Sequence, residues 1–164
     1  MSRENLFRLT AIVAVVAGVL RAIDSFAFEF MSSGASEKLF LVTDIFLLLA
    51  LIGLYARLSG AIGWSGLLGF IVALVGIVMV RSAGDNIDAY VYGATVVAVG
   101  TAIFGATIIA VRAFPVIGPI LWIVALIAGV GAYLVESDWA FEFAGVAFGL
   151  GFVLAGLNLF RRAA

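Results

Sequence analysis

The chain has 164 residues, of which 65% are hydrophobic and only 12% are charged. Soluble domains carry about 25% charged residues, so this composition excludes an ordinary soluble protein and indicates a chain embedded in a lipid bilayer. The absence of histidine and cysteine excludes disulfides, thiolate metal sites, imidazole acid–base catalysis and histidine-ligated haem. We therefore expect neither a metal nor a cofactor.

Charged and polar residues divide the apolar sequence into six segments, each long enough to cross a hydrocarbon core of about 30 Å as a helix. The predicted helices are residues 7–30, 38–57, 61–80, 89–111, 115–135 and 139–160. Short connections join them, including a Ser59-Gly60 turn and the stretch from Arg112 to Phe114. The sequence predicts an all-α, polytopic integral membrane protein. We expect a six-transmembrane-helix bundle of short helical hairpins, forming a single domain over residues 1–164.

The first segment shares features with a signal peptide. Arg3 and Arg8 flank the start of an apolar stretch, and Ser25-Phe26-Ala27 has the small residues of a cleavage site. We expect the segment to be retained as a spanning helix with a polar upper half.

The basic residues predict the orientation. With the N-terminus inside, the cytoplasmic face holds Arg3, Arg8, Arg57, Arg112, Arg161 and Arg162, and the outer face holds Lys38 and Arg81. Acidic residues gather on or near the outer face, namely Glu29, Glu37, Asp85, Asp88, Glu136, Asp138 and Glu142, against Glu4 inside. Because positive charge stays in the cytoplasm, we expect both termini there, in a multi-pass protein of the inner or plasma membrane.

A weak internal repeat accompanies this topology. Arg57 is followed six residues later by Gly63, and Arg112 is followed six residues later by Gly118. Either an ancestral hairpin was duplicated, or any two hairpins with an arginine at the inner turn look this way. Both interpretations stay open.

Small residues predict where the helices pack, because helices in lipid associate through close backbone contact. The glycines that we assign to packing faces are Gly66, Gly69, Gly76, Gly129, Gly145 and Gly149. These faces meet either neighbouring helices of the same chain or a second protein, which leaves a homo-oligomer or a membrane-protein partner open.

Three charged residues within the predicted spans need an explanation, since each costs roughly 2.5 to 3.5 kcal/mol at the bilayer centre. Arg21 lies about 18 Å above the inner edge of the first helix, Asp24 about 22 Å and Asp44 about 21 Å. Arg21 and Asp24 also share a helical face. An ion-paired triad is therefore expected between the first two helices. It either fixes their register or, with one excess negative charge, binds a ligand or relays ions; if the helix boundaries differ, Arg21 and Asp24 extend to the outer surface instead.

Further polar residues lie at a similar level. Glu142 is either a member of this group or a solvated rim residue, and Tyr90 and Tyr92 are candidate neutral partners. The acidic motif from Asp85 to Asp88 is explained by a polar turn with Asp88 as the N-cap of the fourth helix.

Three classes of function fit these features. The favoured one is binding or transport of a small or amphipathic ligand or ion in an outward-facing polar pocket around Arg21, Asp24 and Asp44. The second is a structural or accessory subunit that docks on another membrane protein through its Gly-rich helices. The third and least favoured is a carboxylate-based enzyme acting on a lipid or isoprenoid. The expected partners are the bilayer and an amphipathic or lipid ligand, and not nucleic acid.

Overall fold

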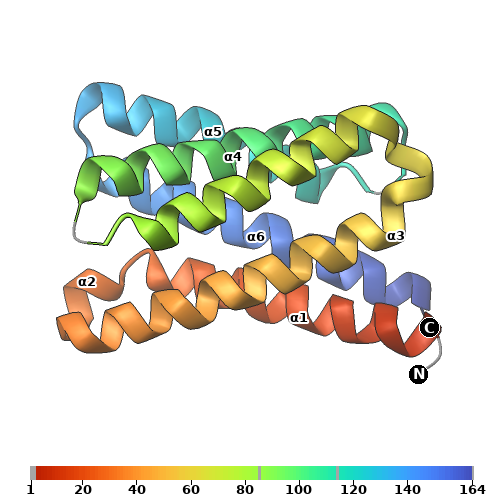
Figure 1. Cartoon of the computed structure of the whole chain (residues 1–164), viewed down its shortest axis with the longest axis horizontal. Coiled ribbons are helices and arrows are strands. Elements are labelled where there is room, and N and C mark those ends of the chain that lie inside the picture. Colours follow the sequence, from red (N-terminus) through yellow and green to blue (C-terminus); the bar gives the residue numbers. More distant parts are fainter. Residues whose placement is uncertain (1–2, 85, 114, 164) are drawn as a thin grey trace.

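The computed structural model describes residues 3–84, 86–113 and 115–163. Its helices are α1 (Arg3–Asp24), α2 (Ala27–Phe30), α3 (Ser33–Ser82), α4 (Ile87–Ala110), α5 (Ile117–Val135) and α6 (Asp138–Ala163). The described residues contain no strand, which confirms the predicted all-α class. The long helices lie side by side, and α1 begins at the same end of the bundle at which α6 ends (Figure 1). Asp85 and Phe114 lie outside the described residues.

Helix α3 reverses direction at Gly63. Its 50 residues would measure about 75 Å in a straight helix, but Gly63 has φ 55° and ψ −155°, a backbone conformation that is essentially restricted to glycine. The rings of Tyr55 and Phe70, on either side of Gly63, stack with their centroids 4.3 Å apart. Figure 1 shows the helix turning back at this point. We call residues 33–62 the first arm of α3 and residues 64–82 the second arm.

The helix boundaries differ from the prediction at three places. Residues 58–60, predicted as a turn, are helical, and the reversal lies at Gly63 instead. The first predicted helix is divided, because α1 ends at Asp24 and α2 begins at Ala27. Ser25 lies in the break, and its Oγ donates back to the Arg21 carbonyl oxygen of α1, at 2.9 Å. Asn86, and not Asp88, is the N-cap of α4, since its side chain accepts a hydrogen bond from the Ala89 amide.

Five helices of the described chain are long and apolar enough to cross a membrane, which is compatible with a multi-pass membrane protein. The prediction from sequence has one span more, because α3 covers two of the predicted spans. The five candidate spans include α3 as a single helix, although α3 reverses direction at Gly63.

The helices pack in the order α1, first arm, second arm, α4, α5, α6, with α6 returning to α1. Glycines bring helix backbones close together: for example, Gly18 of α1 faces Gly149 of α6, and Gly69 of the second arm faces Gly100 of α4. In the interior, the Trp122 ring contacts those of Phe104 and Phe152, and all three are almost fully buried. The bundle therefore has an aromatic centre, in which the Trp122 Nε1 atom is also buried without a hydrogen bond of good geometry to a described residue.

Candidate functional site

Arg21 and Asp24 form an ion pair at the end of α1. The Arg21 Nη1 atom lies 2.7 Å from Asp24 Oδ1, and the side chains are 24% and 1% exposed. The pair follows from the i, i+3 spacing on one helical face, and an arginine in the last turn also complements the negative end of the helix dipole. A charge-assisted hydrogen bond of this length holds the nearly inaccessible Asp24 carboxylate firmly.

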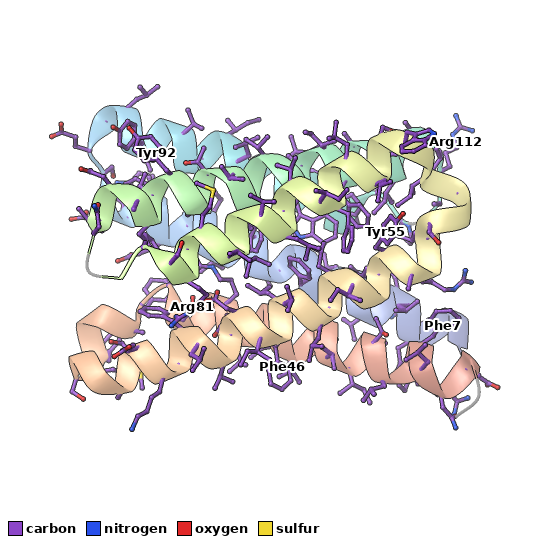
Figure 2. All side chains as sticks on the ribbon, in the orientation of Figure 1. Phe7, Phe46, Tyr55, Arg81, Tyr92 and Arg112 are labelled. Atoms are coloured by element: carbon purple, nitrogen blue, oxygen red, sulfur yellow. The ribbon has the colours of Figure 1, made fainter. Side chains whose placement is uncertain are left out.

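Asp44 makes its ion pair with Arg81. Asp44 Oδ2 lies 3.6 Å from Arg81 Nη1, with side-chain exposures of 17% and 37%. The two residues belong to opposite arms of α3, and Figure 2 labels Arg81 near the end of the bundle that lies opposite Phe7. This pairing differs from the sequence interpretation, in which Arg81 was an outer-face residue and Arg21 served both aspartates. A detectable signal did exist, because Arg81 directly follows the apolar part of its helix and a long arginine side chain can reach back along it.

The four charges therefore form two pairs, with no net charge. Asp44 lies close enough to Arg21 and Asp24 for electrostatic interaction, so the pairs belong to one group. The excess negative charge that the sequence predicted for Arg21, Asp24 and Asp44 disappears once Arg81 is included.

Two buried polar atoms in this group make only long or poorly aligned contacts with neighbouring described side chains. Thr43 is 1% exposed and lies beside the Asp24 carboxylate, yet its Oγ1 has no hydrogen-bond partner of good geometry among the described residues. Asp44 Oδ2 is likewise buried without such a partner, since 3.6 Å to Arg81 is too long for a hydrogen bond. We call Arg21, Asp24, Thr43, Asp44 and Arg81 the polar cluster. Its hydrogen-bonding capacity is only partly used by the described residues.

The remaining predicted ligand-binding residues differ in whether they lie at the polar cluster. Tyr90, on α4 and half-buried, interacts with the Arg21 guanidinium and extends the polar cluster to a further helix. Tyr92 is 66% exposed and does not contribute. Glu142 is half-buried on α6. One turn later, Gly145 lies against Ser25 and Arg21, so that α6 covers the Arg21 side of the polar cluster.

The predicted packing glycines face other parts of the same chain. Gly69 and Gly76 lie against α4, Gly145 and Gly149 against α1, Gly129 near Ala144 of α6, and Gly66 against Ile62 of its own helix. Most of these positions would bring an added Cβ into a neighbouring helix. The glycine faces are thus used inside the bundle.

A separate open surface depression of about 500 Å³ lies where α5 meets α6, lined by Tyr133, Leu134, Glu136, Asp138 and Phe141. It shares no residue with the polar cluster. In the part of the chain that the structure describes, no three acidic, histidine or cysteine side chains are grouped as metal ligands.

Comparison with protein-family models, curated proteins and solved structures finds no match to this chain. The polar cluster and its place in the bundle are therefore the basis on which a function can be argued.

Proposed function

We propose that the chain crosses the membrane six times, with each arm of α3 as a separate span and both termini in the cytoplasm. A straight α3 would be more than twice the thickness of a hydrocarbon core of about 30 Å. The end of the bundle that carries the termini also carries Arg57, stacked over Phe7, and Arg112. The positive-inside rule then places this end in the cytoplasm and the polar cluster in the outer half of the membrane.

We propose that the polar cluster binds a small cation or a protonated amine, and that the protein transports this ligand across the membrane. The observation that carries this proposal is the pair of buried oxygen atoms, Thr43 Oγ1 and Asp44 Oδ2, that make no hydrogen bond of good geometry with a described residue. Leaving such a group unsatisfied costs about 1–3 kcal/mol, more when it is charged. Both atoms can accept a hydrogen bond, so a ligand that donates hydrogen bonds would remove this cost. Because Asp44 is a carboxylate, a positively charged donor is favoured.

The glycines favour this proposal over docking through Gly-rich helices. Gly18, Gly69, Gly100 and Gly149 are all in backbone contact within the chain. A docking partner would have to use other surfaces.

A thermal-unfolding screen in detergent tests the proposed binding. Sodium, potassium, ammonium and ethanolammonium chlorides are compared at equal ionic strength with the bulky cation N-methylglucammonium. A ligand present at a hundred times its Kd stabilises by about 2.7 kcal/mol, which raises the Tm of a chain of this size by about 5 °C or more. We expect at least one of the four cations to produce this rise in the wild type.

The matched variants are Asp44→Asn, which removes the carboxylate, and Asp88→Asn, which removes an exposed one at the same end of the bundle. We expect the rise to disappear in Asp44→Asn and to persist in Asp88→Asn. Equal Tm values in all five salts, or a rise that survives Asp44→Asn, would contradict the proposal.

A further inference from the structure

We propose that Asp44 is also the proton-binding residue of the polar cluster, so that a proton and the cationic ligand compete for the same carboxylate. This inference rests on the site of the proposed function and adds a second, chemically defined occupant. It starts from the difference between the two aspartates. They lie in one group, but their surroundings are unequal.

The charged form of Asp24 is stabilised by a hydrogen-bonded counter-charge. Its carboxylate accepts a hydrogen bond of 2.7 Å from Arg21, and its side chain is 1% exposed. Protonating Asp24 would leave the Arg21 guanidinium, 24% exposed, without its hydrogen-bonded counter-charge in a poorly solvated place. Such an uncompensated buried charge is costly.

Asp44 is in the opposite situation. Its Oδ2 atom is buried without a hydrogen bond of good geometry to a described residue, and its ion pair with Arg81, at 3.6 Å, is longer than the 2.7 Å pair of Asp24 with Arg21. The charged groups that act on it are Arg81 from the second arm and Arg21 and Asp24 from α1. Burial of this carboxylate, whose acceptor capacity is not filled, favours addition of a proton to that oxygen, and so does the negative charge of Asp24, whereas Arg81 and Arg21 oppose it.

The proton transfer balances simply. A hydronium ion from the outer aqueous phase gives its proton to Asp44 Oδ2, which becomes a neutral carboxylic acid, and a water molecule is left. Arg81 then loses its partner, but its side chain is 37% exposed and can be solvated from the outer surface. Protonation of Asp44 therefore costs less free energy than protonation of Asp24, because the arginine left without a partner is more exposed.

Competition with the ligand follows from the same atom. A cation or protonated amine needs Asp44 Oδ2 as an acceptor, whereas the carboxylic acid offers a hydrogen there. Binding of one cation should release one proton, which is the exchange expected of a proton-coupled site.

Infrared difference spectroscopy of the full chain in lipid tests the inference without any ligand, because protonated carboxylic acids give a carbonyl band distinct from carboxylates and amides. We expect acidification from pH 8 to pH 5 to produce this band in the wild type. It should persist in Asp24→Asn and in the exposed control Asp88→Asn. It should be lost from Asp44→Asn.

Arg81→Gln provides a second measurement in case Asp44→Asn alters the fold. Removing the cation beside Asp44 favours the neutral acid, so the band should be at least twofold stronger than in the wild type at the same intermediate pH. A missing band in the wild type, a band lost with Asp24→Asn instead, or an unchanged band in Arg81→Gln would overturn the inference. A proton band without any cation-induced rise in Tm would refute the proposed ligand alone, and the reverse result would refute only the proton.

Discussion

Asp44 and Arg81 belong to the same 50-residue helix, yet Asp44 Oδ2 and Arg81 Nη1 lie 3.6 Å apart. They meet because Gly63 reverses the chain between them. The stacked rings of Tyr55 and Phe70 also join the two arms of α3. The reversal of α3 is therefore what assembles the polar cluster, and changes at Gly63 should affect both the fold and the site.

Arg21→Ala should destabilise the protein much more than Arg81→Ala. The first change leaves Asp24 buried without its counter-charge, which costs about 3 kcal/mol. The second removes a longer, partly exposed pair, for which about 1 kcal/mol is expected. Thermal unfolding in detergent, followed by tryptophan fluorescence, measures the difference.

The control for this prediction is the double variant Arg21→Ala with Asp24→Asn. It removes the stranded charge, and most of the lost stability should return. If the double variant is no more stable than Arg21→Ala, the damage comes from lost packing of the arginine side chain and not from an uncompensated carboxylate.

Gly63→Ala should cost about 1–3 kcal/mol, because alanine rarely adopts the backbone angles of this residue. Gly60→Ala is the matched control, since Gly60 is helical and an added Cβ there meets nothing within 4 Å. That change should stabilise the helix by about 0.5–1 kcal/mol. Equal Tm values for the two variants would place the reversal of α3 elsewhere.

Gly149→Ala should destabilise the bundle by about 1–3 kcal/mol through overpacking. Its Cβ would collide with the Gly18 carbonyl oxygen and come within 3.0 Å of the Ala22 amide nitrogen of α1. Gly131→Ala is the control, because nothing lies within 4 Å of its added Cβ. Unfolding midpoints and elution volumes of both variants check the prediction. An unchanged midpoint for Gly149→Ala would show that α1 and α6 can separate at this point.

The sequence predicts the helices well because hydropathy and charge spacing are local properties. The reversal of α3 is not local: Ser59-Gly60 is the stronger turn signal, but continuing the helix to residue 62 buries Leu58 and Ile62. Burial of these side chains outweighs the turn preference, and Gly63 is then the first residue able to reverse the chain. Hydropathy alone therefore does not predict at which residue α3 reverses.

For the candidate site, too, the sequence predicts the contacts within one helix but not those between helices. The Arg21–Asp24 pair follows from helical spacing and is present at 2.7 Å. The Asp44–Arg81 pair depends on the register of two helix arms, which helical spacing along one segment does not determine. Level along the helix likewise does not distinguish Tyr90 from Tyr92, whereas the packing of α4 leaves Tyr92 exposed.

The central claim is that the polar cluster binds a cation and is more than a structural link between helices. A quadruple variant with Arg21→Gln, Asp24→Asn, Asp44→Asn and Arg81→Gln removes all four charges together, so no charge is left unpaired and the fold should be kept. The decisive measurement is the Tm of this variant with and without the cation that stabilises the wild type. We predict a folded protein whose Tm no longer responds to that cation. A quadruple variant that still shows the wild-type rise in Tm would contradict the account, because binding would then take place elsewhere.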